Sequence, residues 1–367
     1  MVILMNDGDV FSKMNGLCFP YKVEEYDNKN FVEVCSRVYS KLFDEISKRV
    51  FSNRLLYSLT YDTRYMRNLI LDTEEGKKFW NIVKGKSPYI YGAGRFGQRL
   101  QTIFNDIAWK GFIDKNKTGS LNGLKIFRID EVEICNDVVI SIQEGYDSVK
   151  KELLELGFQE NNLIAIGEFD KRQTKSIYFE EDILPRHVDS ASFFVDVGAY
   201  DGKDTLNYGR FYDLDKSELH AFVYEPDVYN FKECSRLLFG YENVHLKNAC
   251  LGSENGTVSF SVGNGVSSSI STSGEDNVLV NRLSDEVKDK HISYIKMDVE
   301  GMEKTALIGA EDIIRLQRPL LAISVYHKRN DIWDLPNTIL DMCSDYRLYL
   351  RHYKICGTDT VLYCVPN

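Results

Sequence analysis

The chain has 367 residues, is 43% hydrophobic and carries a formal net charge of −10 at pH 7. This length predicts two or three domains with a sizeable core. The acidic balance argues against a nucleic-acid partner, because phosphate binding requires a basic surface. None of the eight cysteines forms a Cys-x-x-Cys pair, so we expect reduced thiols rather than zinc ligands or disulfides.

Neither a membrane span nor a signal peptide is recognisable in the sequence. No apolar run approaches the roughly 18–20 residues that a bilayer requires. The start, MVILMNDGDV, has only a short apolar stretch, and no basic segment precedes it. We therefore expect a cytoplasmic protein without a membrane span.

Residues 1–86 form the first predicted segment, and their pattern is helical. Apolar residues recur at helical spacing within 30–51, and a second helical stretch covers 63–85. The apolar positions of the first stretch are Phe31, Val34, Val38, Leu42, Ile46 and Val50. We expect these helices to serve packing, and they offer a surface for a homodimer.

The pattern changes at residue 87, where short apolar strands begin to alternate with helices. This alternation continues to 172 and predicts parallel βαβ units, so we expect a small Rossmann-like domain over 87–172. Residues 173–189 are more charged and less periodic, which predicts a linker. A second α/β series fills 190–367 and ends in two strands with period-2 alternation.

The first glycine loop is YGAGRFG, in which Gly92, Gly94 and Gly97 follow a strand and open a helix. Asp114 ends the next strand. This context matches the dinucleotide fingerprint, in which backbone approaches a pyrophosphate and the acid binds ribose. However, the segment is roughly half of a full dinucleotide fold, and no catalytic partner for a nicotinamide is evident.

The same segment resembles the nucleotide-sugar-binding domain of bacterial sugar acetyltransferases. That resemblance is carried by the GAGxxG turn and by GFIDKN at 111–116. Three alternatives remain open for this loop: binding of a nucleotide-sugar substrate, a scaffold without a ligand, and NAD binding.

The second glycine loop is FFVDVGAYDG, in which a buried strand leads into Gly198 and Gly202. Its spacing is Gly-x-x-x-Gly rather than the dinucleotide pattern, which suits a ligand whose amino-acid part lies against the loop. Glu225 ends the next strand, where a carboxylate can accept hydrogen bonds from ribose hydroxyls.

A group of acids and a histidine follow two later strands. The stretch IKMDVEGME ends an apolar strand at Asp298, with Glu300 and Glu303 directly after it. His327 and Lys328 follow the next strand. Because the carboxyl ends of parallel strands meet at one edge of a sheet, we expect these residues to converge there.

Residues of about 190–367 resemble the FkbM family of S-adenosylmethionine-dependent methyltransferases. The resemblance is carried by FVDVGAYDG, YEP, KNACLGSENGTVSF, RLSDEV, IKMDVEGMEKTALIGA, LAISVYH and LRHY…DTVLY. It implies a class I methyltransferase domain with a mixed seven-stranded sheet. The family loop commonly has Asn where this chain has Tyr200 or Asp201, so no contact is assigned to those two.

The resemblance also implies the cofactor site. Gly198 and Gly202 map to the S-adenosylmethionine loop, and Glu225 maps to the ribose ligand. Asp196 is expected beside the methionine moiety, and Asp298, on the same edge, is expected to bind the cofactor as well. Asn248, after the third strand, is expected near the adenine.

Methyl transfer to a hydroxyl requires alignment of the acceptor and removal of its proton. His327 is the first candidate for the base and Asp298 the second, and Lys328 can stabilise an alkoxide. Glu300 and Glu303 are expected to orient the substrate or to cap the following helix. A divalent ion held by Asp298, Glu300 and His327 is an alternative that spacing alone does not support, so no metal is predicted.

The sequence therefore predicts an O-methyltransferase that acts on a sugar hydroxyl. The expected acceptor is a nucleotide-linked sugar or a glycan intermediate of surface polysaccharide synthesis, with the first glycine loop holding the nucleotide. The alternatives are an NAD-dependent oxidoreductase that uses residues 92–97 and a non-catalytic subunit that binds nucleotide-sugars.

Overall fold

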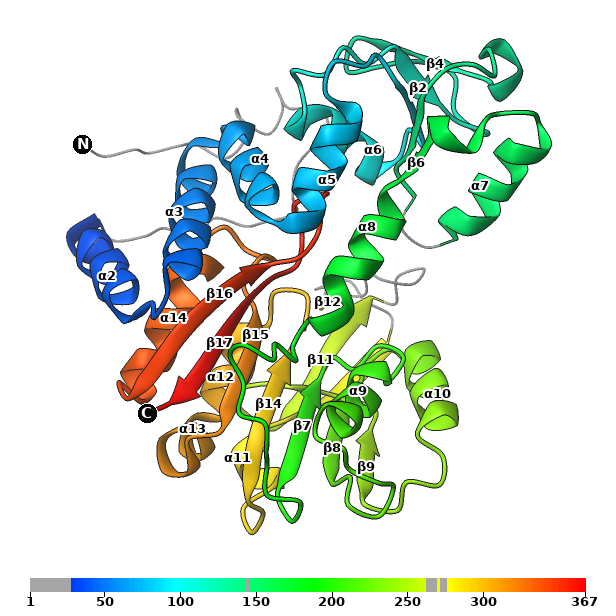
Figure 1. The fold of residues 1–367 in the computed structure, drawn as a ribbon. Coiled ribbons are helices and arrows are strands. Elements are labelled where there is room, and N and C mark those ends of the chain that lie inside the picture. The colour runs from blue at the N-terminus through cyan, green and yellow to red at the C-terminus, as the bar shows by residue number, and fades with distance from the viewer. Residues whose placement is uncertain (1–27, 143–144, 262–268, 271–275) are drawn as a thin grey trace. The chain divides into compact units, whose positions relative to one another are not determined.

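The computed structural model describes residues 28–142, 145–261, 269–270 and 276–367 (Figure 1). Their contacts form two compact units. In the part described, unit 1 comprises 49–177 and 352–359, and unit 2 comprises 28–48, 178–351 and 360–367. The first 27 residues of the predicted helical segment, including the stretch considered for a signal peptide, lie outside the described residues.

Unit 1 contains a six-stranded sheet in the order β3-β4-β2-β1-β5-β6. The strand β1 pairs in parallel with β2 and β5, as do β2 with β4 and β5 with β6, whereas β3 pairs antiparallel with β4. Its strands are β1 (Tyr89–Tyr91), β2 (Gly111–Ile113), β3 (Gly119–Leu121), β4 (Leu124–Phe127), β5 (Val138–Ile140) and β6 (Leu163–Ala165). The predicted alternation of strands and helices is present here.

The helices of unit 1 are α4 (Thr63–Asp72), α5 (Glu74–Val83), α6 (Arg95–Ile103), α7 (Tyr146–Glu155) and α8 (Ile166–Gln173). Short 3-10 turns lie at η1 (Ile129–Glu131), η2 (Glu160–Asn162) and η3 (Thr174–Ser176). Buried Val138 and Ile140 of β5 pack with Leu153 of α7 and with Phe158 in one apolar cluster. Burial of this apolar surface is the main force that holds the helix on the sheet.

Unit 2 contains the predicted mixed seven-stranded sheet, in the order β16-β17-β15-β14-β7-β8-β9. Strands β15, β14, β7, β8 and β9 are parallel, and β17 runs antiparallel to β15. Its strands are β7 (Phe193–Val197), β8 (Ala221–Tyr224), β9 (Val244–Lys247), β14 (Ile292–Met297), β15 (Leu320–Ser324), β16 (Tyr346–His352) and β17 (Thr360–Pro366). The class I methyltransferase architecture is therefore confirmed.

A four-stranded sheet in the order β10-β13-β11-β12 accompanies the main sheet of unit 2. Its strands are β10 (Ala249–Leu251), β11 (Gly256–Ser261), β12 (Ser269–Ile270) and β13 (Asp276–Asn281). The helices of unit 2 that follow β7 in the chain are α9 (Lys203–Phe211), α10 (Val228–Leu237), α11 (Leu283–Glu286), α12 (Glu303–Gly309), α13 (Glu311–Gln317) and α14 (Asp331–Met342).

The helical run predicted over 30–51 is broken into α2 (Asn28–Lys41) and α3 (Glu45–Thr60). The Asp44 carboxylate accepts the backbone N–H of Ser47 at 2.7 Å and so caps the start of α3. The break also lets the N–H of Phe43 donate to the carbonyl of Leu348 at 2.9 Å. The apolar spacing predicts one continuous helix, but the cap at Asp44 starts a new helix within it.

Two segments group differently from the predicted domain boundaries. Helix α2 belongs to unit 2, where Arg37 donates to Asn337 Oδ1 of α14 at 3.0 Å. Residues 352–359 belong to unit 1, where the N–H of Ile355 donates to the carboxylate of Asp170 at 3.0 Å. The boundaries at 86, 172 and 189 therefore remain a proposal about the chain.

Two further findings concern the described residues of both units. No helix among the described residues is long and apolar enough to cross a membrane. The seven cysteines within the described ranges are all free thiols.

Candidate active site

The site lies where the strand order of unit 2 reverses. From β7 the chain proceeds to β8 and β9 on one side, and later to β14 and β15 on the other (Figure 1). In open parallel sheets, ligands bind outside the carboxyl ends of the strands at this switch point. Gly198 follows β7 and Asp298 follows β14, so the glycine loop and the first acid of the IKMDVEGME stretch meet there.

Gly198 brings these two strand ends into direct contact. Its backbone has a φ of +74°, which favours glycine, and a Cβ placed on it would lie 1.9 Å from the carbonyl oxygen of Asp298. The N–H of Asp298 donates to the carbonyl of Val197 at 3.0 Å. No larger residue fits at Gly198 without separating the loop from the strand that carries Asp298.

Asp196, near the end of the strand that leads into the glycine loop, makes its contacts inside the protein. Its side chain is fully buried, receives the ammonium of Lys296 at 3.0 Å and accepts the hydroxyl of Thr205 at 2.8 Å. Lys296 also donates to the carbonyl of Gly198 at 2.7 Å. Because both oxygens of Asp196 are engaged inside the protein, the arrangement favours a bracing role over the predicted contact with the cofactor.

Lys296 is a functional residue that the sequence analysis missed. Burial would lower the pKa of this lysine, but the neighbouring carboxylates, chiefly Asp196 and Asp204, raise it well above its ordinary value. Burial in turn raises the pKa of Asp204 to about 6. The sequence did contain a signal for this residue, namely a lysine inside an apolar strand. A buried charge requires a partner, so such a lysine indicates a nearby carboxylate.

Glu225 lies at the carboxyl end of β8, as predicted, and is 5% exposed. Its two carboxylate oxygens accept the N–H groups of Tyr200 and Asp227, each at 2.8 Å. A carboxylate oxygen has two lone pairs, so each oxygen retains one for a ribose hydroxyl. Burial raises the pKa of Glu225 from 4.5 to about 7, against the lowering effect of the two N–H groups.

This environment predicts that cofactor affinity depends on pH. If Glu225 is the ribose ligand, the ribose hydroxyls donate to its ionised form, so S-adenosylhomocysteine should bind best above pH 7 and lose up to tenfold in affinity per pH unit well below it. Replacing Glu225 with Gln should weaken binding by about 10–100-fold at high pH, because hydrogen bonds to charged groups contribute about 1.5–3 kcal/mol. It should also flatten the pH profile. Calorimetry between about pH 6 and about pH 8 measures both effects, and a wild-type affinity that does not change with pH would exclude Glu225 as the ribose ligand.

Asn248 and Gly202 support the loops of the predicted cofactor site. The Asn248 amide donates to the carbonyls of Glu225 and Pro226 at 2.8 and 2.9 Å, so both of its N–H groups are used. Only its oxygen is left to meet an adenine. Gly202, at φ +82°, is the residue before α9 and shapes the turn into that helix.

Asp298 is held by a tyrosine that the sequence analysis assigned to a linker. The hydroxyl of Tyr178 donates to Asp298 Oδ2 at 2.9 Å, and the Lys296 ammonium lies 5.2 Å from the centre of the Tyr178 ring. The sequence signal was a Tyr-Phe pair within a charged stretch; Phe179 packs against Phe194 of β7 at 6.3 Å between ring centres. Tyr178 therefore orients the carboxylate that faces the switch point.

His327 lies beside the acids, as predicted, and is 8% exposed. Its Nδ1 is 2.8 Å from Oε1 of Glu303, and its Nε2 is 3.4 Å from Oδ1 of Asp298 and 3.8 Å from Oε1 of Glu300. Glu303 is 1% exposed and also accepts the N–H of Val299 at 3.0 Å. Glu303 thus fixes the ring and the loop before α12, and its burial disfavours direct substrate contact.

The charges around His327 alter the proposed acid–base roles. Burial alone would lower the pKa of His327, but the surrounding carboxylates, Glu303 first and then Asp298 and Glu300, raise it to about 10. Burial would raise the pKa of Asp298, but His327, Lys296 and the Tyr178 hydroxyl lower it. An imidazolium cannot accept a proton, which argues against His327 as the base in this state.

Glu300 and Lys328 lie next to this cluster. Glu300 has a φ of +50°, and Gly301 follows at +96°, so two successive left-handed residues turn the chain sharply after Asp298. A Cβ on Gly301 would lie 3.5 Å from Cε of Lys328, which places the lysine stem against this turn. The N–H of Lys328 donates to Asp331 at 2.6 Å, at the start of α14.

The first glycine loop, in unit 1, is held by its own side chains. The Asp114 carboxylate accepts the N–H groups of Ala93, Asn116 and Lys117 at 2.9 to 3.0 Å. These bonds outweigh burial and lower the pKa of Asp114. Both oxygens of Asp114 are therefore engaged by the backbone, which weakens the predicted ribose contact.

The glycines of that loop differ in the space around them. A Cβ on Gly97 would lie 2.0 Å from the carbonyl oxygen of Gly92, so helix α6 packs closely on β1. A Cβ on Gly94 would meet nothing within 4 Å among the described residues. The open side of the loop is therefore at Gly94.

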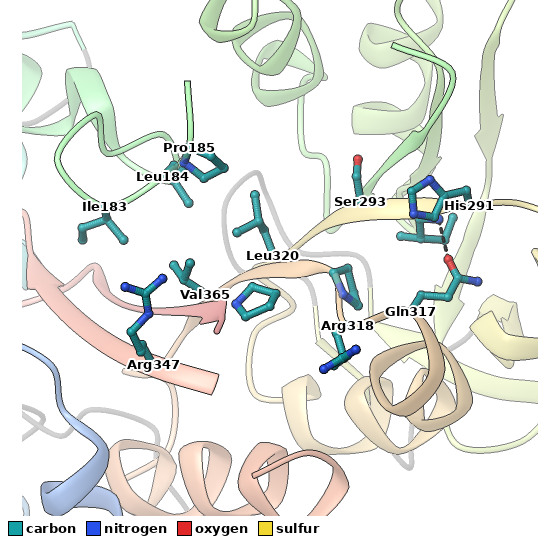
Figure 2. Close-up of a pocket in the computed structure, with 13 residues that line it drawn as sticks. Ile183, Leu184, Pro185, His291, Ser293, Gln317, Arg318, Leu320, Arg347 and Val365 are labelled. Carbon is teal, nitrogen blue, oxygen red and sulfur yellow. Dashed lines mark hydrogen bonds between the residues drawn. The ribbon is translucent and has the colours of Figure 1, made fainter. Parts of the chain in front are cut away.

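A pocket of about 500 Å³ lies elsewhere in unit 2 (Figure 2). Leu184, Pro185 and Leu320 line it, and Arg318 and Arg347 stand at its sides. It adjoins the first residues of β14 and β15, whereas Asp298 and His327 follow the last residues of those strands. Since open sheets bind ligands at the carboxyl ends, we assign the reaction to the switch point rather than to this pocket.

The fold and the loops at its switch point define a Rossmann-like methyltransferase domain. Residues 196–354 match the family model described as the Methyltransferase FkbM domain. This part of the chain is therefore an FkbM methyltransferase domain, and the protein is a methyltransferase whose cofactor is S-adenosylmethionine. No curated protein sequence matches the chain.

One solved structure shares this fold over most of the chain, and two others show weaker likenesses. Methyltransferase FkbM from Methylobacillus flagellatus KT is 19% identical with a TM-score of 0.51, and the match covers 86% of this chain and 99% of that one. An rRNA methylase from Streptococcus thermophilus is 19% identical over 49% of this chain and 89% of that one, with a TM-score of 0.33. Aeropyrum pernix fibrillarin in complex with S-adenosyl-L-methionine is 10% identical over 50% and 69%, with a TM-score of 0.32. The last two likenesses are too weak to add to the assignment.

Proposed function

We propose that this methyltransferase transfers the methyl group of S-adenosylmethionine to a hydroxyl oxygen of a sugar. The observation that carries the proposal is the cluster of Asp298, Glu300 and His327 directly beside the Gly198 loop. Carboxylates bind and orient hydroxyl donors, and a hydroxyl must lose its proton as it attacks. An acceptor that is already a good nucleophile would not need such a cluster.

The reaction is an in-line displacement at the methyl carbon. The acceptor oxygen forms a bond to that carbon while the carbon–sulfur bond breaks, and S-adenosylhomocysteine leaves as the neutral thioether. Asp298 is the better placed proton acceptor, because it faces the switch point, while His327 carries a proton that opposes the charge of the acids. Lys328 is proposed to stabilise the negative charge that develops on the acceptor oxygen.

The proposed substrates are nucleotide-linked sugars or glycan intermediates of surface polysaccharide synthesis. Unit 1 would then hold the nucleotide, with Gly92, Gly94 and Gly97 shaping the phosphate loop at the start of α6. Because backbone N–H groups engage the Asp114 carboxylate, the proposal gives this loop the phosphates and assigns it no ribose contact. A cytoplasmic location and a dimer through the N-terminal helices belong to the same proposal and rest on the sequence alone.

Replacing Gly94 with Asp tests the role of unit 1. The φ of Gly94 is −84° and a Cβ there has open space, so the change adds a negative charge without a clash. We expect it to abolish calorimetric binding of a nucleotide-sugar to the full-length protein, because a carboxylate repels the phosphates. The matched control is Gly256→Asp in unit 2, a glycine that also has open space. Equal binding by both variants would contradict a phosphate site at this loop.

A thermal-shift panel tests the function as a whole. The full-length protein is melted with S-adenosylhomocysteine, NAD and several nucleotide-sugars, singly and in pairs. A ligand at about a hundredfold excess over its Kd stabilises the folded state by about 2.7 kcal/mol. We expect S-adenosylhomocysteine and one nucleotide-sugar to raise the Tm. A shift with NAD alone would instead favour an oxidoreductase, and a shift with nucleotide-sugars alone would favour a binding subunit.

A further inference from the structure

We propose that Asp298, Glu300 and His327 bind a divalent metal ion, with Glu303 holding the imidazole ring from its other side. The catalytic use of this ion rests on the proposed function, since the ion would lie where the acceptor hydroxyl binds. The existence of the ion site does not rest on it and can be measured separately.

The first support is the spacing of the ligand atoms. Metal–ligand bonds to imidazole nitrogen and carboxylate oxygen are about 2.0–2.2 Å, so neighbouring ligand atoms around one ion lie roughly 3 to 3.6 Å apart. Nε2 of His327 is 3.4 Å from Oδ1 of Asp298 and 3.8 Å from Oε1 of Glu300. Glu303, which holds the ring from its other side, also has a carboxylate oxygen within 4.8 Å of ligand atoms of Asp298 and His327, so acids surround the imidazole on both sides. The oxygen of Glu300 is the farther of the two from Nε2, and this half-exposed side chain must move toward the ring to complete the set.

The second support is a buried nitrogen with no hydrogen bond. Within the described ranges, Nε2 of His327 has no hydrogen-bond partner, although this atom is almost completely shielded from solvent. A buried polar atom without a partner costs about 1–3 kcal/mol, so such atoms are rare unless a water, an ion or a ligand completes them. Nε2 points toward the two carboxylates, which is where an ion would bind it.

The third support is the contact on the opposite nitrogen. Nδ1 of His327 is 2.8 Å from Oε1 of Glu303, and an ionised carboxylate only accepts, so Nδ1 carries the hydrogen. Histidines that bind metals almost always donate their other N–H to a carboxylate or carbonyl. This contact keeps the hydrogen on Nδ1, so Nε2 is the nitrogen that can exchange its proton for an ion, and it fixes the direction in which Nε2 points.

The charge balance of the cluster also favours a cation. Three carboxylates, those of Asp298, Glu300 and Glu303, lie within 3.8 Å of one imidazole. The nearby Lys296 is paired with Asp196 at 3.0 Å. A divalent ion would offset two of the three negative charges and would replace the proton on Nε2.

The donor set indicates the kind of ion. Mg²⁺ and Ca²⁺ prefer sites made of oxygen alone, whereas imidazole with carboxylates suits Mn²⁺, Fe²⁺ or Zn²⁺. Such an ion would bind the acceptor oxygen and lower the pKa of its hydroxyl, so the proton would leave to a neighbouring carboxylate and then to water. No change of oxidation state is involved.

Binding of Mn²⁺ tests the site without any enzymatic readout. Full-length protein freed of metal is titrated with Mn²⁺, and the free ion is counted from its electron paramagnetic resonance signal. We expect one tightly bound ion per chain. Glu300→Gln changes an amino acid that is about half exposed, so it should leave the fold intact while weakening binding at least tenfold. Asp298→Asn and His327→Gln should weaken it further.

The matched control is His291→Gln, which removes a histidine whose Nδ1 lies 3.8 Å from a single carboxylate, that of Asp189. It should leave Mn²⁺ binding unchanged. Binding absent from the wild type, or equal in the wild type and the Asp298→Asn and Glu300→Gln variants, would overturn the proposal. Methyl transfer that persists in excess chelator would overturn the catalytic use of the ion while leaving the sugar assignment intact. Tight Mn²⁺ binding without methylation of any sugar would overturn the sugar assignment and leave the ion site intact.

Discussion

Replacing Asp298 with Asn is expected to lower kcat for methyl transfer by about 10²–10⁴, the usual contribution of a group that removes a proton in the transition state. Asn retains the shape and can still accept the Tyr178 hydroxyl, which lies 2.9 Å from Oδ2. It removes the negative charge that faces both the acceptor and His327. Initial rates with saturating S-adenosylmethionine measure the loss.

The affinity for S-adenosylhomocysteine separates this effect from damage to the cofactor loop. We expect that affinity to change little, because Gly198 and Glu225 are untouched. The matched control is Asp345→Asn, which removes an exposed carboxylate that pairs with Arg318 at 3.1 Å. A kcat within a factor of about three of the wild type would contradict the assignment of Asp298 to the reaction.

Replacing Lys296 with Met is expected to destabilise the protein by about 3–5 kcal/mol, because it leaves the fully buried Asp196 carboxylate without its charged partner. The same change removes the ammonium that donates to the carbonyl of Gly198, so cofactor binding should weaken as well. Urea unfolding followed by circular dichroism measures the free energy, and calorimetry measures the affinity.

Two comparisons make this result specific. Lys304→Met breaks an ion pair whose lysine is 40% exposed, at 2.8 Å from Asp334, and should cost at most about 1 kcal/mol. The double variant Asp196→Asn, Lys296→Met should recover part of the loss, because Asp196 then no longer leaves an unpaired charge. The recovery stays partial, because Asp204, 3.5 Å from the Lys296 ammonium in the wild type, still loses its partner. If Lys296→Met and Lys304→Met cost the same, the buried pair does not brace the loop.

The parallel sheet and its edge could be predicted because they follow from local patterns. Apolar strands, a glycine loop after β7 and an acid after β8 each lie within a few residues of chain, and the carboxyl ends of parallel strands meet by geometry. Thus Gly198, Glu225, Asp298 and His327 could be assigned to one edge from the sequence.

The residues that were missed depend on contacts between distant segments. Tyr178 reaches Asp298 from a stretch without a clear period, and Lys296 pairs with Asp196 only because β14 and β7 are neighbours in the sheet. The charge state of His327 could not be predicted either, because it depends on Glu303, Asp298 and Glu300 acting together. Spacing locates such groups but does not give their mutual distances.

The first glycine loop shows the opposite difficulty. The sequence of Gly92, Gly94 and Asp114 matches a ligand fingerprint, yet the Asp114 carboxylate is engaged by three backbone N–H groups of its own unit. The same pattern thus describes both a binding loop and a self-contained turn, and only the hydrogen bonds distinguish them.

The most direct test of the central claim is transfer of a labelled methyl group from S-adenosylmethionine to a panel of nucleotide-sugars and glycan oligosaccharides. Products are analysed by mass spectrometry and by NMR to locate the new methyl group. We predict that the wild type forms a methyl ether on one sugar oxygen and that Asp298→Asn forms far less. Methylation at a nitrogen or on a non-sugar acceptor, with every sugar unmodified, would contradict the proposed function.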